Sequence, residues 1–283
     1  MLFSTGCFFG LGAVGRLSPP RLRPRPIRLP PIKGEHALVP LVLLSFLIIW
    51  ECVVWIGEYP AFILPTPQRV AARFLIAVRD GTLQTHTLVT LQEVFGGLAL
   101  GLSFAVVLGY SLARSRLLDR VLSPYIVASQ AVPIVALAPL LVIWFGAGSL
   151  SKVLVCALTL FFPVLVNTAV GIRNVDPGLL ELMRSLRASH WQIFKHLELP
   201  AALPVLFGGL KVGVTLSVIG AVVGEFVGAD RGLGFLVNLA RGLFDTPLMF
   251  VALLTLMSIA LALYVIVSAL ESWLLRWRWP EES

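Results

Sequence analysis

The sequence predicts an all-α integral membrane protein with six transmembrane helices, and two observations carry this prediction. Hydrophobic residues make up 58% of the 283 residues and charged residues only 13%, whereas soluble domains contain about 25% charged residues. Six segments are also apolar enough and long enough to cross a bilayer, which takes about 20 residues of helix. The composition excludes a disordered chain, and the small number of cysteines excludes a secreted scaffold held by disulfides.

The six predicted spans are nearly free of charged residues. Glu51 is the only charged residue of the first span and Lys211 the only one of the fifth, while Pro124, Pro133 and Pro139 interrupt the third. The predicted spans are residues 37–57, 94–113, 121–146, 153–170, 205–224 and 247–270.

The membrane domain is predicted to cover residues 37–279, with a short segment on either side of it. Residues 1–36 contain a stretch rich in Pro and Arg, which favours an extended cytoplasmic arm, and residues 280–283 form a tail. Trp273, Trp277 and Trp279 alternate with arginines after the last span, a pattern typical of an anchor at the lipid headgroups.

The distribution of basic residues predicts the orientation. If the N-terminus lies in the cytoplasm, the cytoplasmic segments carry most of the Lys and Arg, as the positive-inside rule requires. We therefore expect a multi-pass protein of the inner (cytoplasmic) membrane with both termini in the cytoplasm. The net charge of +7 is explained by these loops, so we expect no nucleic-acid partner.

The sequence contains no residues arranged for catalysis. It lacks the phosphate-binding pattern G-x-x-x-x-G-K-[ST] and the zinc pattern H-E-x-x-H, and its four histidines show no metal-ligand spacing. We therefore expect no enzymatic activity, no metal and no cofactor. If the chain does work, the energy must come from an ion gradient or from a partner protein.

Charged residues inside the spans bear on the choice between these two energy sources. Glu51, Glu93, Lys211 and Glu225 are all close enough to a predicted membrane surface to lie at the interface or to extend toward it. The other possibility is that they line a translocation path, and Glu225 is the best candidate. No deep pair of opposite charges, of the kind that an ion-coupled carrier would use, is visible in the sequence.

Residues 176–200, between the fourth and fifth spans, predict two short cytoplasmic helices. Asp176 followed by Pro177 is typical of a helix start, and Ser189 with Gln192 forms the pattern of a capping box. The second helix should run over residues 190–199 and stop at Pro200. Both helices are basic and amphipathic, so their apolar side chains must pack on the membrane domain or on a partner.

The same segment resembles a cytoplasmic motif of bacterial ABC-transporter permeases. That motif reads Glu-Ala-Ala, three residues, Gly, nine residues, Ile, any residue, Leu-Pro, and Glu181, Leu199 and Pro200 stand at the matching positions. Leu197 replaces the isoleucine. Arg187 stands where the motif has glycine, at a turn where left-handed backbone is expected.

Other stretches resemble the permeases that import sulfonates, taurine, nitrate and related small solutes. Leu64-Pro65-Thr66-Pro67 is similar to a Leu-Pro-Ser-Pro signature, and Trp144-Phe145-Gly146 is similar to part of the third span. Glu225 with Gly232-Leu233-Gly234 resembles the fifth span and the outer loop of that group. The similar stretches occur in the expected order over residues 37–279.

The resemblance implies a permease subunit that forms the path for a small sulfonate-like, taurine-like or nitrate-like solute. It implies a second permease, usually a copy of the same chain, two separate ATP-hydrolysing subunits, and a periplasmic or lipid-anchored solute-binding protein. The alternative is a secondary transporter driven by an ion gradient.

The resemblance also implies two sets of site residues. The residues expected to couple the permease to the ATPase are Glu181, Arg184, Arg187, Ser189, Trp191, Phe194, Leu199 and Pro200. The residues expected along the path are Gln130, Pro133, Pro139 and Glu225. A solvated basic surface remains open for the arginines, and a hydrogen bond between helices remains open for Gln130. Gly97 and Gly101 are expected to form a close-packing seam instead of a solute contact.

Overall fold

The computed structural model describes residues 35–276, and this part of the chain is helical throughout, without strands. It divides into two units within the first helix, α1 (Glu35–Gly57): residues 35–46 belong to the first unit and residues 47–276 to the second. Residues 1–34 of the predicted arm, Trp277, Trp279 and the tail lie outside the described residues, and the last two residues of that arm begin α1.

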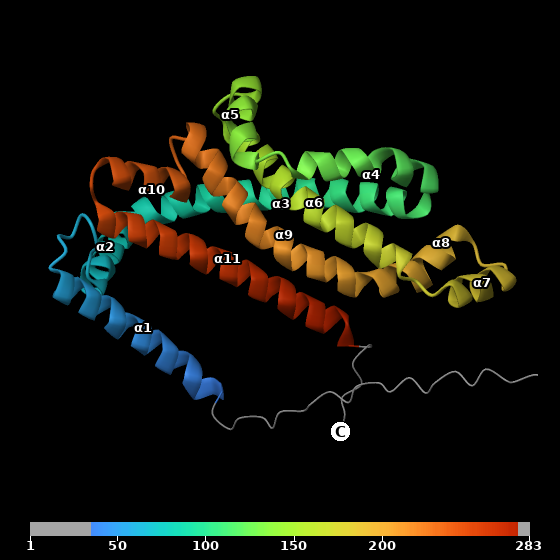
Figure 1. The fold of residues 1–283 in the computed structure, drawn as a ribbon, viewed down its shortest axis with the longest axis horizontal. Coiled ribbons are helices and arrows are strands. Elements are labelled where there is room, and N and C mark those ends of the chain that lie inside the picture. The colour runs from blue at the N-terminus through green and yellow to red at the C-terminus, as the bar shows by residue number, and fades with distance from the viewer. Residues whose placement is uncertain (1–34, 277–283) are drawn as a thin grey trace, which may run out of the picture. The chain divides into compact units, whose positions relative to one another are not determined.

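Four long helices form the core of the second unit. They are α3 (Thr82–Arg114), α6 (Ser149–Arg173), α9 (Leu199–Gly228) and α11 (Thr246–Leu274) (Figure 1). α6 packs against both α3 and α9, and α11 covers α9 on another side. Two helix pairs lie at opposite ends of this bundle: α7 (Pro177–Ser185) and α8 (His190–Ile193) at one, α2 (Pro67–Arg79) and α10 (Leu233–Gly242) at the other.

Small residues let α3 and α6 approach closely. Gly97, Gly101, Ala105 and Gly109 recur every four residues on α3, and all four are buried. A Cβ atom on Gly101 would lie 2.7 Å from the carbonyl oxygen of Ala157 in α6, closer than van der Waals contact permits. The predicted packing seam at Gly97 and Gly101 is therefore confirmed, and it is longer than expected.

The predicted third span is not one continuous helix. α4 (Arg116–Gln130) and α5 (Ile134–Phe145) meet at a bend of 97°. Pro133 at the bend has no backbone N–H and cannot continue the hydrogen-bond pattern of α4. Five described helices are long and apolar enough to cross a membrane by themselves, and the count reaches six if the bent pair forms one span.

Two short helices were not predicted, and all six spans start earlier than predicted, α3 and α9 by the most. α2 and α10 are too short to cross a membrane, and their polar residues kept them from being recognised as apolar segments in the sequence. α3 begins at Thr82 instead of residue 94, and α9 begins at Leu199 instead of residue 205. The ion pair between Arg73 of α2 and Asp245, 2.9 Å apart, joins α2 to the start of α11.

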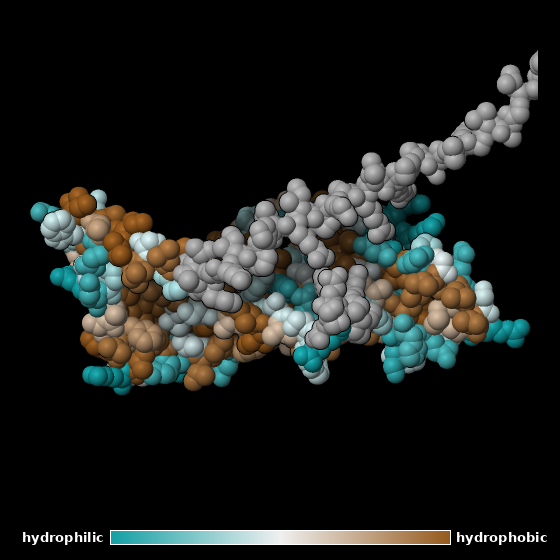
Figure 2. All heavy atoms as spheres, turned by 90° about the horizontal axis from the view of Figure 1, so that it is seen from below, coloured by the Kyte–Doolittle hydropathy of each residue, from teal (hydrophilic) through white to brown (hydrophobic). Residues whose placement is uncertain are grey.

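Large apolar side chains cover much of the surface, as a bilayer requires. Figure 2 shows them spread over the visible face of the bundle. Val107 on α3 is 67% exposed and Ile143 on α5 is 75% exposed. A soluble monomer does not leave such a continuous apolar surface in contact with water.

The seam between α3 and α6 leads to a first prediction. We expect Gly101→Val to lower the thermal unfolding midpoint of the purified protein, because overpacking of a tight contact destabilises by about 1–3 kcal/mol. The matched control is Gly208→Ala on α9, where a new Cβ atom would meet no atom within 4 Å. Equal midpoints for the two variants would contradict a close contact at Gly101.

Candidate functional site

The segment between α6 and α9 forms the helix pair predicted from its caps. The backbone N–H of Gly178 donates to the Asp176 carboxylate at 2.7 Å, which caps α7. At the start of α8, Ser189 N–H donates to the Gln192 side chain at 2.7 Å, and Gln192 N–H donates to the Ser189 hydroxyl at 3.3 Å. We call residues 176–198 the coupling segment.

The end of this segment differs from the prediction of a helix stopped at Pro200. α8 continues through the π-helical turn η1 (Phe194–Glu198) directly into α9. The N–H of Leu199 donates to the carbonyl of Phe194, five residues earlier. Pro200 lies in the first turn of α9, directly after this π-helical turn, and it does not end the helix. The coupling segment is therefore joined to α9 without a loop.

Arg187 keeps the left-handed turn that glycine provides in the related motif. Its φ angle is +55°. Arg187 N–H donates to the Arg184 carbonyl at 2.9 Å, and Ala188 N–H donates to the Met183 carbonyl at 3.0 Å. These bonds close the C-terminus of α7 in the usual way for a left-handed cap. The substitution preserves the turn, at a strain of roughly 1 kcal/mol.

The outer surface of α7 carries a stripe of exposed leucines. Leu179, Leu182 and Leu186 are 47%, 54% and 70% exposed, and their spacing places them on one face of the helix. None of the residues of α7 is buried. Sequence reasoning singled out Glu181 and Arg184 instead, although the leucine spacing was visible. Glu181, Arg184 and Arg187 are exposed around this stripe.

The other predicted coupling residues lie closer to the bundle. Phe194 packs edge-on against Tyr110 of α3, with ring centroids 5.2 Å apart, and Trp191 lies 5.6 Å from Phe194. Trp191 remains 68% exposed. These side chains, with Leu199, line a largely apolar pocket of about 450 Å³ between α3, α6 and α9. Pro200 is half-buried at the start of α9.

Three of the predicted path residues lie on the bent pair α4 and α5. Gln130, Pro133 and Pro139 are all exposed. The side chain of Gln130 makes no hydrogen bond within the described part of the chain, so the bond between helices that the sequence left open is not formed there. The bend therefore presents a polar side chain and interrupted backbone on the surface.

Glu225 lies at the opposite end of the bundle and is buried, with 1% of its surface exposed. Its carboxylate accepts a hydrogen bond from the Thr90 hydroxyl at 2.6 Å and another from the backbone N–H of Gly234. Thr90 also accepts from the N–H of Leu233 at 2.8 Å. Glu225 and Thr90 thus hold the N-terminus of α10 against α3 and α9.

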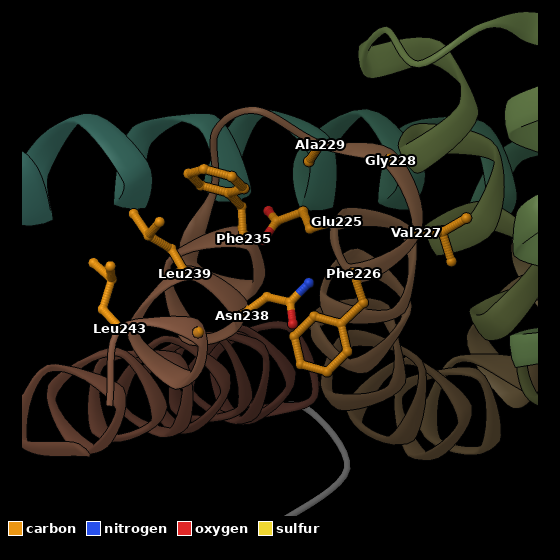
Figure 3. A pocket seen from close by; sticks show the side chains of 10 residues that line it. Glu225, Phe226, Val227, Gly228, Ala229, Phe235, Asn238, Leu239 and Leu243 are labelled. Atoms are coloured by element: carbon orange, nitrogen blue, oxygen red, sulfur yellow. The ribbon is translucent and has the colours of Figure 1, made fainter. Parts of the chain in front are cut away.

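This arrangement explains the Gly232-Leu233-Gly234 sequence. Gly232 has a φ angle of +113°, which side chains disfavour. A Cβ atom on Gly234 would lie 2.8 Å from a carboxylate oxygen of Glu225. Figure 3 shows Glu225 beside Phe235 and Asn238 at a pocket of about 500 Å³ between the end of α9 and α10.

Neither Glu225 nor Glu93 of α3 extends its side chain to the protein surface. Glu93, like Glu225, is buried and only 2% exposed. The carboxyl group of Glu93 lies near that of Glu225, but its Oε2 atom has no hydrogen-bond partner within the described residues. Glu225, by contrast, accepts from Thr90 and Gly234.

The carboxyl pair leads to a second prediction. Glu225→Gln places an amide where two donors converge. We expect it to lower the free energy of local opening of α10 by about 1–3 kcal/mol, the usual cost of losing a buried hydrogen-bond partner. Glu93→Gln is the matched control, because it changes the neighbouring carboxyl group and leaves the Glu225 carboxylate with its two donors, Thr90 and Gly234. Hydrogen exchange of the amides of residues 232–235 measures the difference. Equal protection in the two variants would show that the carboxylate of Glu225 does not hold α10.

The comparisons with known proteins agree with this arrangement of helices. Residues 98–277 match the family described as the binding-protein-dependent transport system inner membrane component. The riboflavin transport system permease protein RibX of Chloroflexus aurantiacus is 50% identical over 91% of this chain and 96% of its own. The formylaminopyrimidine transport permease protein ThiX of Halalkalibacterium halodurans is 35% identical over 87% and 98%.

A putative aliphatic sulfonates transport permease protein, SsuC of Bacillus subtilis, is 32% identical over 85% of this chain and 86% of its own. Among solved structures, the MetNI methionine ABC transporter in inward-facing conformations has a TM-score of 0.52 and 21% identity over 65% of this chain and 90% of its own. That likeness supports the fold. With most of its length matched by one family model and by full-length relatives, the chain belongs to the inner-membrane permease components of binding-protein-dependent ABC importers.

Proposed function

We propose that this chain forms the path for a small solute and transmits the work of separate ATP-hydrolysing subunits through α7 and α8. The observation that carries the proposal is the exposed leucine stripe of α7. The stripe lies on a helix pair at one end of the bundle, and that pair continues into α9 without a loop. A force applied to α7 and α8 is therefore passed directly to a helix of the core.

The stripe is suited to a protein groove. Leu179, Leu182 and Leu186 make an apolar ridge, and an amphipathic helix with such spacing typically docks its ridge into a groove of a partner. Arg184 and Arg187 flank the ridge and would meet acidic groups there. Because the ATPase subunits are cytoplasmic, this end of the bundle and both chain termini are placed in the cytoplasm by the same proposal.

The bend between α4 and α5 supports a second permease copy. Backbone that leaves the helical pattern is not stable against lipid, and it occurs in membranes only against protein or beside water. Gln130 and Pro133 are exposed at this bend. We therefore infer that a second copy covers this surface, with Gln130, Pro133 and Pro139 along the path between the copies. Two ATPase subunits and a binding protein complete the proposed assembly.

An ion pair between two core helices is the observation that favours the alternative, a secondary transporter. Lys211 of α9 pairs with Glu271 in the last turn of α11, and both side chains are 22% exposed. Such pairs occur in ion-coupled carriers. Here Lys211 already has its partner and Glu225 has Thr90, and a carrier has no use for the exposed leucines of α7. We therefore keep the ATP-driven importer.

The solute is better described as a small heterocycle than as a sulfonate or nitrate. The relatives named for riboflavin and formylaminopyrimidine are 50% and 35% identical to this chain, while the sulfonate and taurine relatives are 32% and 30% identical. Residues 121–148, which include the bend, carry no charged side chain. An uncharged surface suits a neutral ring more than an anion, which would call for a cation or backbone N–H groups.

The docking proposal leads to a third prediction. We expect Leu182→Asp combined with Leu186→Asp to abolish co-purification of the ATPase subunits, because two charges would be buried in the groove. The matched control is Leu117→Asp on α4, a leucine that is 73% exposed outside the coupling segment. The permease itself should remain in the membrane in both cases. Retention of the ATPase by the double variant would refute docking through α7.

The solute proposal leads to a fourth prediction. Vesicles that contain the assembled importer and its binding protein should take up riboflavin in an ATP-dependent manner, and taurine should not compete. Uptake is measured with labelled riboflavin, and vesicles without ATP are the control. Uptake of taurine alone would return the assignment to the sulfonate group and leave the ATP-driven mechanism intact.

A further inference from the structure

The contact between the coupling segment and α3 depends on one buried carboxylate, Glu198. It is the last residue of η1 and only 2% exposed. Its oxygens lie 3.2 Å from Nη1 of Arg114 and 3.4 Å from the hydroxyl of Tyr110, both in the last turns of α3. A carboxylate buried to this extent requires such partners, and losing one leaves an uncompensated charge.

Tyr110 and Arg114 form a matched surface for η1. Arg114 Nε donates to the Tyr110 hydroxyl at 3.3 Å, and that hydroxyl donates to Glu198. One turn away, the ring of Phe194 packs on the ring of Tyr110. Two residues of the π-helical turn, four positions apart, are thus fixed to two residues of α3 with the same spacing.

The core helices are linked to the coupling segment in different ways. α6 leads into the segment and α9 follows it, so both are joined to it by the chain itself. α3 has no such connection, although it packs along α6 and also contacts α9. Tyr110 and Arg114 are the residues of α3 that bond to η1 itself.

We propose that Glu198 is a positioning residue which, through Arg114, makes α3 follow the coupling segment when the ATPase subunits close. This rests on the proposed function of α7 and α8. Without the ion pair, α7, α8 and α9 would still move with the ATPase, while α3 would lag behind. ATP would then be hydrolysed without the full rearrangement of the path.

The test uses the reconstituted complex of permease, ATPase subunits and binding protein. Glu198→Gln keeps the shape of the side chain and removes its charge. We expect the ATPase subunits to stay bound and basal hydrolysis to persist, while stimulation by the binding protein falls about tenfold, as for loss of a typical coupling free energy. Exchanging the charges, with Arg114→Glu and Glu198→Arg together, should recover part of the stimulation.

The matched control is Asp119→Asn. Asp119 pairs with Arg173 at 2.7 Å at the same end of the bundle and joins α4 to α6 without touching the coupling segment. The Asp119→Asn complex should keep the stimulation of ATP hydrolysis by the binding protein. Tyr110→Phe removes only a hydroxyl from the contact, and we expect it to lose part of the stimulation by the binding protein. It replaces Glu198→Gln in the test if the Glu198→Gln complex does not assemble.

Three results would overturn the inference. The first is full stimulation of ATP hydrolysis by the binding protein in a Glu198→Gln complex. The second is a loss of stimulation in Asp119→Asn equal to that in Glu198→Gln. The third is full stimulation in Tyr110→Phe if the Glu198→Gln complex does not assemble. Failure of the proposed function looks different, because the wild-type permease would then not retain ATPase subunits at all.

Discussion

The close approach of α6 to its two neighbours is the constraint on which the rest of the structure depends. Gly97, Gly101 and Gly109 bring the backbone of α3 against α6, and a Cβ atom on Gly220 of α9 would lie 2.9 Å from the Cα of Cys156 in α6. In a bilayer the hydrophobic effect does not drive helices together, so close backbone packing must supply much of the free energy of helix association. A core built this way has few contacts between flexible side chains, so its helices are suited to moving as rigid units.

Polar contacts are placed at the two ends of this core. At one end Glu225 and Thr90 secure α10, and at the other Glu198 and Arg114 secure the coupling segment. Between the ends the contacts of α3 with α6 are made by small and apolar side chains. Directional bonds therefore fix what is attached to the bundle, and packing fixes the bundle itself.

The spans and the caps of the coupling segment could be predicted because their causes are local. Apolar length identifies a span, and a serine followed by glutamine three residues later identifies a helix start. The roles of Glu225 and Glu198 could not be predicted in this way. The hydroxyl that contacts Glu198 is 88 residues away along the chain, and the one that contacts Glu225 is 135 residues away. Their burial is a property of packing.

The short helices show the same difference between local and long-range causes: one with a local cap was predicted, and one held by distant residues was not. α7 carries its own cap at Asp176, and it was predicted. α10 has no side-chain cap of its own, because its first N–H groups are bonded by residues of α3 and α9. The bend at Pro133 was visible as a proline, but its angle depends on what α5 packs against.

The π-helical turn of η1 has a consequence for how this chain tolerates changes of length. A π turn holds one residue more than an α turn, so it absorbs an extra residue within a single turn. Deleting one residue within 194–198 would return the turn to regular α-helix and leave α7 and α8 in nearly the same orientation about the axis of α9. The contacts of Phe194 and Glu198 with α3 would change instead, because the spacing between these two residues includes the extra one.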